Sequence, residues 1–390
     1  MHPVFFMMAV LLDPDLLPII LAANPDVRTL HQSAVVCSVW RAAAAVSKHS
    51  LRVLGGYTAC VRGRDPRLAS TGFYFHRHVA AAPDGVVCVG DLNNRRFRLI
   101  RPEDGGFIED NLPPFHLSPR GVAIHAGEFI LLGCTNRGRW FAQSFRRQHT
   151  LSGSSWRGTR LALADSNGDD LHLAEGISVL EQTLFVAESG ADRVHAFNLG
   201  IDFQLYTEDD FYLDVGAEFV AVCRPRFSLD DFNRPTGLAA QGTSLFVVDT
   251  GNSRLQVFKL DGQAAPEGAA SRHIFSGATF ERNIGRAGNA PGCFSEPRGC
   301  ALLREELLVV SEARRIQVLD LHGTPIQVVA PPHARHSGLW GLTVCSDNRR
   351  VCVMSTVRNE MHTLEVLPCP RDREAQSQSQ TEKTDSLPHV

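Results

Sequence analysis

The sequence has little lysine and no long apolar run, and both shortages narrow the range of functions. Lysine occurs three times in 390 residues, at Lys48, Lys259 and Lys383, so arginine supplies nearly all of the 39 positive charges. With 42 acidic residues the formal net charge is −3, which leaves no global basic field to hold a polyanion. No segment reaches the ~20 consecutive apolar residues that a membrane span needs. We therefore expect no membrane partner, and nucleic acid is a minor option.

The ten cysteines include no Cys-x-x-Cys pair, and disulfide frameworks belong to small secreted domains. Cys345 and Cys352 flank a predicted hairpin and could lie opposite each other, but reduced, half-buried thiols are the better interpretation. The apolar N-terminus lacks the cationic segment and the clean cleavage site of a secretory signal. These features predict a soluble intracellular protein, cytoplasmic or nuclear.

The chain does contain a repeated phrase of short strands and turns. Its clearest copy spans 232–262, where runs of apolar and β-branched residues alternate with turns rich in Gly, Asn and Asp. Strands of four to seven residues joined by such turns predict a β-meander. Each copy has an anchor position near the start of its first strand, and the six anchors are Val79, Gly121, Gly176, Gly237, Gly299 and Gly341.

The shortest steps between anchors are 42 residues, and a period near 40 with three or four strands per copy indicates a β-propeller. The longer steps hold insertions, chiefly around 144–168, 200–228 and 263–291. The phrase in 232–262 resembles the NHL repeat, whose copies usually close into six-bladed propellers. The expected fold is therefore mainly β, with a six-bladed propeller over 73–369 and a polar, disordered tail over 370–390.

Residues 1–50 read as two short helices, and a linker over 51–72 contains apolar stretches that could supply a ring-closing strand. The run from Leu12 to Leu21, a Pro-Asp break at 25–26 and the Val-Cys-Ser-Val-Trp ending at Trp40 resemble an F-box, although Asp13 and Pro14 depart from the usual opening. A generic helical hairpin packed on the side of the propeller is the other interpretation.

The F-box resemblance implies docking to a Skp-type adaptor of a cullin-RING ubiquitin ligase. The apolar residues that such an adaptor would bury are Leu16, Leu17, Ile20, Leu30, Val36 and Trp40. The propeller would then present an unknown protein target for ubiquitination. On this hypothesis the chain is a non-catalytic substrate receptor that needs no cofactor.

An enzyme is the competing hypothesis, because some six-bladed propellers are metal-dependent lyases or lactonases. Such sites need His, Asp, Glu or Asn from several inner strands, whereas the inner strands here are mostly small and apolar. His76 and His78 share one face of a predicted strand but have no carboxylate partner, so they are weak metal ligands. Nucleophile-elbow, Walker and dinucleotide motifs are absent. A stand-alone lyase-like or lactonase-like enzyme, or a small-ligand or RNA binder, remains the alternative.

Residues next to the anchors are the best candidates for recognition. In a propeller, equivalent positions lie on one ring at the end where the inner strands begin, and a residue that differs from blade to blade there is free to serve binding. These positions are His78, Arg120, Glu175, Thr236, Arg298 and Trp340. Because Arg and Trp are frequent interface anchors, we expect this rim to bind the target.

Acidic and basic residues also recur at the bend after the second strand of a blade, as in Asp91 and Arg96 or Asp249 and Arg254. A residue repeated in several blades usually serves the blade. We therefore expect the carboxylate to brace the bend while the arginine reaches groups on the neighbouring blade.

Overall fold

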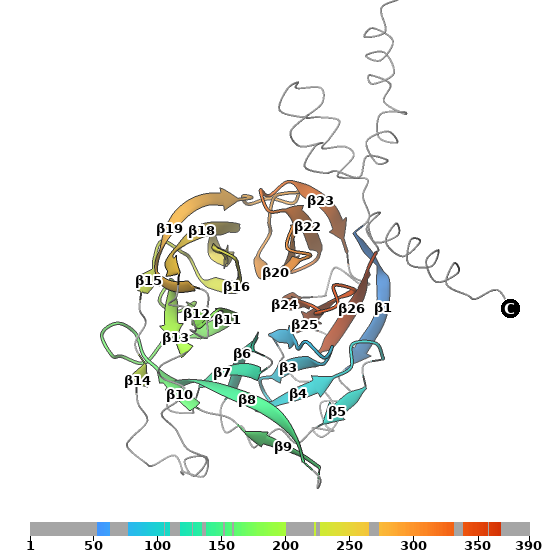
Figure 1. Ribbon diagram of the computed structural model, residues 1–390. Helices are drawn as coiled ribbons and strands as arrows, with labels where there is room; N and C mark the ends of the chain where they lie inside the picture. Colours follow the sequence, from blue (N-terminus) through green and yellow to red (C-terminus); the bar gives the residue numbers. More distant parts are fainter. Residues whose placement is uncertain are drawn as a thin grey trace, which may run out of the picture.

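A computed structural model describes residues 53–62, 77–104, 106–109, 118–126, 128–134, 138–150, 153–157, 160–199, 222–223, 227–264, 273–330, 338–357 and 359–367. In these segments the chain forms six β-sheets arranged around a common axis (Figure 1). The prediction of a mainly β, six-bladed propeller is therefore confirmed. The F-box-like segment 1–50 and the tail 370–390 lie outside the described residues.

The six sheets, called blades A to F in chain order, share one antiparallel plan. Their first strands are β2 (Val79–Ala81), β6 (Ser118–His125), β11 (Ala174–Leu180), β16 (Pro235–Gln241), β20 (Pro297–Leu303) and β24 (Leu339–Val344). Each of these inner strands contacts the inner strand on either side, and β24 contacts β2. The ring is therefore closed around its axis by the first strands alone.

The second strands are β3 (Val87–Asp91), β7 (Glu128–Cys134), β12 (Thr183–Glu188), β17 (Ser244–Asp249), β21 (Leu307–Glu312) and β25 (Arg350–Ser355). They are rich in Val, Leu and Phe and are buried along almost their whole length. Because neighbouring blades cover both faces of each sheet, these strands carry continuous apolar runs.

The third strands are β4 (Arg96–Ile100), β8 (Trp140–Thr150), β13 (Arg193–Asn198), β18 (Arg254–Ala264), β22 (Ile316–Asp320) and β26 (Glu360–Val366). The outer strands are β5 (Phe107–Glu109), β10 (Arg160–Leu163), β15 (Phe227–Leu229), β19 (His273–Ile284), β23 (Pro325–Val329) and β1 (Leu54–Arg62). Blade B also holds β9 (Gly153–Arg157) and β14 (Val222–Cys223), and a 3-10 turn (Thr250–Asn252) follows β17.

Blade F is completed by the strand that comes first in the described chain. β1 pairs antiparallel with β26, as Figure 1 shows where the blue strand lies beside the dark red one. The Gln327 side chain of blade E fastens this strand, because its Oε1 accepts from the backbone N–H groups of Val53 and Leu54 and its Nε2 donates to the Leu54 carbonyl. The ring-closing strand thus comes from the 51–72 segment.

Among the residues that the structure describes, the hydrophobic core forms six clusters, and each one lies between two adjacent blades. Phe185 and Leu245 meet between blades C and D, for example, and Val89 and Met354 between blades A and F. No blade can bury its apolar faces alone, so the ring must close for any blade to be covered.

The acidic and basic residues at the bend after the second strand pair with each other within one blade. Asp249 accepts from Arg254 at 2.8 Å and Asp91 from Arg96 at 3.1 Å. The carboxylates do brace the bends, as we expected. The expectation that the arginine reaches a neighbouring blade is wrong for Arg254, because the bend places it opposite Asp249 on the adjacent strand of the same sheet.

Candidate functional site

The ring mouth, meaning the end of the ring where the inner strands begin, is built on glycines. A Cβ atom added to Gly237 would lie 2.8 Å from the carbonyl oxygen of Arg298, and one added to Gly299 would lie 2.9 Å from that of Trp340. Only glycine permits this approach, because a Cβ would collide with the backbone of the next blade. The close packing brings the residues before the inner strands to one small area.

Glu175 lies at the centre of the charged groups there. One carboxylate oxygen, Oε1, accepts from Arg77 Nη1 at 2.5 Å and from Arg120 Nη1 at 3.2 Å. The other oxygen, Oε2, lies 3.6 Å from His78 Nε2. Glu175 and His78 are buried, whereas the side chains of Arg77 and Arg120 keep 19% and 18% of their surface exposed. The mouth therefore presents guanidinium groups over a buried acid and imidazole.

Trp340 extends this cluster across the mouth. The guanidinium carbon of Arg77 lies 4.4 Å from the centroid of its ring, and that of Arg298 lies 4.2 Å from it. Arg298 also pairs with the exposed Glu296 at 2.9 Å. Stacking on an aromatic ring suits guanidinium groups, which are weakly hydrated and planar. One indole thus holds two like charges near each other.

Thr236 differs from the other five predicted rim residues. Its buried hydroxyl donates to the carbonyl of Arg298 and contacts the Thr250 hydroxyl at 2.7 Å. Thr250 in turn donates to the Pro297 carbonyl. The structure places Thr236 in a brace between blades D and E, where it positions Arg298.

The environment fixes the charges of the central pair. Burial lowers the pKa of His78, and the opposing attraction of Glu175 does not overcome it, so His78 is neutral at pH 7. Burial alone would raise the pKa of Glu175, but the polar contact with His78 and the positive charges of Arg77 and Arg120 outweigh it and lower that pKa. Glu175 is therefore a carboxylate. Among the described residues, the guanidinium groups of Arg77 and Arg120 pair with Glu175 and that of Arg298 pairs with Glu296.

Several buried polar atoms of this cluster lack a hydrogen-bond partner. They are Nε of Arg120, Nε1 of Trp340, Nε2 of His78 and Oε2 of Glu175. Buried polar groups are normally satisfied, and each exception calls for a reason such as a bound molecule. These atoms mark the ring mouth as a candidate ligand site.

The structure thus places the predicted rim residues at the ring mouth, together with Arg77, which was not among them. Blade A has Val79 at its anchor where the other five blades have glycine, so its register was less certain by about one residue. The carbonyl of Arg77 accepts from the Gly341 N–H at 2.8 Å, which places Arg77 at the mouth beside His78. The predicted adaptor-binding residues Leu16, Leu17, Ile20, Leu30, Val36 and Trp40 lie outside the described residues, as does His76.

A divalent metal does not fit this donor set. Among the described residues no three His, Cys, Asp or Glu side chains are grouped so that they could hold a metal ion. At the mouth, the buried carboxylate of Glu175 already faces two guanidinium groups, which would repel a cation. The chemistry proposed below therefore uses side chains alone.

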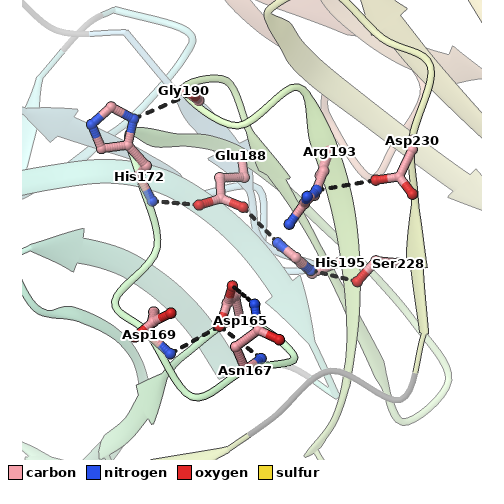
Figure 2. Close-up of polar contacts among 10 residues, drawn as sticks. All are labelled: Asp165, Asn167, Asp169, His172, Glu188, Gly190, Arg193, His195, Ser228 and Asp230. Atoms are coloured by element: carbon pink, nitrogen blue, oxygen red, sulfur yellow. Dashed lines mark hydrogen bonds and ion pairs between the residues drawn. The ribbon is translucent and has the colours of Figure 1, made fainter.

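A second polar cluster lies in blade C (Figure 2). His195 Nδ1 is 2.7 Å from Ser228 Oγ, and its Nε2 is 2.7 Å from Glu188 Oε2. Arg193 turns away to pair with Asp230 at 3.1 Å, so the bend acid of this blade binds a histidine in place of the arginine. An acid, a histidine and a serine in this order resemble a catalytic triad.

The other blades explain the cluster without catalysis. The position of His195 holds Gln256 in blade D and Gln317 in blade E, and each of these glutamines donates to the acid at its own bend. The imidazole is also fully buried. We therefore assign Glu188 and His195 to the bracing of blade C.

Three comparisons relate the chain to known proteins. A family model described as the NHL repeat matches residues 232–258. No curated protein matches the chain. Among solved structures, a gluconolactonase from Xanthomonas campestris is similar with a TM-score of 0.52 and 14% identity, over 81% of this chain and 99% of that one. A protein provisionally described as a gluconolactonase has a TM-score of 0.51 and 17% identity, over 80% and 94% of the two chains.

These findings correct the functional prediction. At such identities the similarity shows the fold alone, and the two named neighbours are described as gluconolactonases, one of them provisionally. The prediction of a non-catalytic ubiquitin-ligase adaptor is wrong. The apolar inner strands misled the prediction, because the chemistry-bearing residues stand just before or at the start of those strands.

Across the described part of the chain there is no helix with the length and apolarity to cross a bilayer.

Proposed function

We propose that this chain is a stand-alone propeller enzyme that opens small cyclic esters at the ring mouth, a lactonase-like hydrolase that uses no metal ion. The observation that carries the proposal is the meeting of neutral His78, ionised Glu175 and two partly exposed arginines at one point. The proposal needs nothing from residues 1–50, whose resemblance to an F-box stays a prediction.

The groups have roles that match ester hydrolysis. A neutral imidazole can take a proton from water, and a carboxylate beside it stabilises the imidazolium that forms. His78 would be this base and Glu175 its partner, with 3.6 Å between Nε2 and Oε2. Guanidinium groups stabilise an oxyanion as it develops, and Arg77 and Arg120 are the nearest ones to the pair.

Lactone opening would proceed by addition of water to the carbonyl carbon, followed by cleavage of the ring C–O bond. The oxygen of a water molecule bonds to the lactone carbonyl carbon while His78 takes a proton from it, and the carbonyl oxygen becomes an oxyanion beside the arginines. The oxyanion collapses, the ring C–O bond breaks, and the departing alkoxide takes the proton from His78. The product is an open-chain hydroxy acid, which loses a proton to solvent and leaves as a carboxylate.

Acid release from a panel of five- and six-membered sugar lactones tests the proposal, with the spontaneous rate subtracted. We expect turnover by the wild-type protein, and a loss of at least about 100-fold in kcat for His78→Gln, since general bases typically contribute this much. His125→Gln is the matched control, because His125 ends β6 at the opposite end of the ring. Thermal unfolding of each variant checks that it folds.

Dialysis against a chelator separates the proposal from a metal enzyme. We expect the rate to be unchanged by the chelator and by added zinc or calcium. No turnover of any lactone by folded wild-type protein would overturn the proposal. Turnover that the chelator abolishes and a metal restores would overturn it as well.

A further inference from the structure

The buried polar atoms at the ring mouth that lack hydrogen-bond partners indicate which chemical groups a ligand must have to bind there. Arg120 Nε and Trp340 Nε1 are donors, and both are buried without an acceptor. Glu175 Oε2 is an acceptor without a donor. A ligand that fits all three must accept hydrogen bonds at one end and donate at the other.

The positive charges at the mouth indicate that the hydrogen-bond-accepting group of the ligand is an anion. Arg77, Arg120 and Arg298 are gathered at the mouth, with Arg77 and Arg298 stacked on the same indole. Burial lowers the pKa of Arg298, and repulsion from Arg77 and Arg234 lowers it further, against the attraction of Glu296. Like charges held this close are relieved by an anion, and planar guanidinium groups match the two oxygens of a carboxylate.

The donating end fits a hydroxyl group. Oε2 of Glu175 belongs to an ionised carboxylate, which only accepts hydrogen bonds. Nε2 of His78 lies 3.6 Å from it, so a hydroxyl placed there could donate to Glu175 and contact the imidazole as well. A second anionic group at this position would be repelled by Glu175.

We infer that the ring mouth binds a small hydroxycarboxylate, with its carboxylate on Arg120, Arg298 and the Trp340 N–H and a hydroxyl on Glu175. The inference deepens the proposed function, since a hydroxy acid is the product of lactone opening, and it names the class of molecule that the site retains. The same recognition would favour lactones of polyhydroxy acids over lactones that carry no hydroxyl groups.

Titration calorimetry with sodium gluconate, sorbitol and inorganic phosphate tests this inference without any turnover. Sorbitol keeps the hydroxyl groups and lacks the carboxylate, whereas phosphate supplies charge without a carbon chain of hydroxyls. We expect gluconate to bind at least about tenfold more tightly than either of the others. Equal binding of sorbitol, equal binding of phosphate, or no binding of gluconate would each overturn the inference.

Variants test the placement of the carboxylate. Arg120→Gln and Trp340→Phe, the latter keeping an aromatic ring and losing the N–H, should each weaken gluconate binding, the first by about tenfold or more. Arg350→Gln is the matched control, because Arg350 lies at the opposite end of blade F and pairs with Glu103. If the control weakens binding as much as the two mouth variants, the ligand is not held where we place it.

Failure of the inference and failure of the proposed function give different results. Gluconate binding without hydrolysis of any lactone would support the inferred binding site and contradict the proposed lactonase activity. Hydrolysis of lactones by a protein that binds gluconate and sorbitol equally would support the proposed lactonase activity and contradict the inferred recognition of a carboxylate.

Discussion

At the scale of single residues, the ring mouth depends on burial more than on residue type. His78 and Glu175 would titrate near neutral and acidic pH in water, but burial beside arginines sets one neutral and the other charged. The sequence named both as rim residues without showing that they meet. Their contact depends on how closely two blades approach, which only the packing of the whole ring determines.

The lowered pKa of His78 predicts how turnover depends on pH. A base must be unprotonated, so kcat/KM should stay level above neutral pH and fall as the pH drops through the pKa of His78, which lies below the ordinary 6.5. The unfolded chain then binds a proton at a higher pH than the folded chain does, so the free energy of unfolding should also decrease below about pH 6.5. A pH profile of lactone hydrolysis with parallel urea unfolding measures both. A rate that rises as the pH falls below 6 would contradict the assignment of His78.

At the scale of elements, a comparison of equivalent positions in different blades shows which polar groups stabilise the blade. The acid at the bend accepts from Gln256 in blade D, from Gln317 in blade E and contacts His195 in blade C. The cluster of blade C therefore follows the plan of the other blades with a different side chain. Its serine is an addition that the repeat does not require.

This comparison predicts that His195→Gln is tolerated. A glutamine places an amide donor where blades D and E have one, so unfolding free energy should change by less than about 1 kcal/mol. His195→Ala should cost about 1–3 kcal/mol, because it leaves the buried Glu188 carboxylate without that donor. Urea unfolding of both variants measures the difference. Loss of lactone hydrolysis in a fully folded His195→Gln protein would instead make the Ser228 cluster catalytic.

The blades could be predicted from the sequence because close packing against the next blade requires glycine at the anchor position. Five of the six anchors are glycines that meet the backbone of the next blade, and the same collision recurs at each one. The strands β9 and β14 lie within the predicted insertions around 144–168 and 200–228, but their pairing with blade B was not predicted. Irregular additions follow contacts particular to one blade, which a repeat pattern cannot encode.

At the scale of the whole molecule, ring closure is what makes a site out of separate blades. Six interblade clusters and the closing strand β1 hold the inner strands against one another. His78 of blade A, Glu175 of blade C and Trp340 of blade F are then neighbours at the mouth although they lie far apart in the sequence. The class of fold followed from the period, whereas the proposed function rests on this convergence.

A crystal structure of the protein grown with sodium gluconate is the most direct test of ligand binding at the ring mouth. We expect gluconate at the ring mouth, with its carboxylate within hydrogen-bond distance of Arg120 and Trp340 and a hydroxyl on Glu175. A metal ion coordinated by Glu175, or gluconate bound elsewhere while the mouth holds only water, would contradict it.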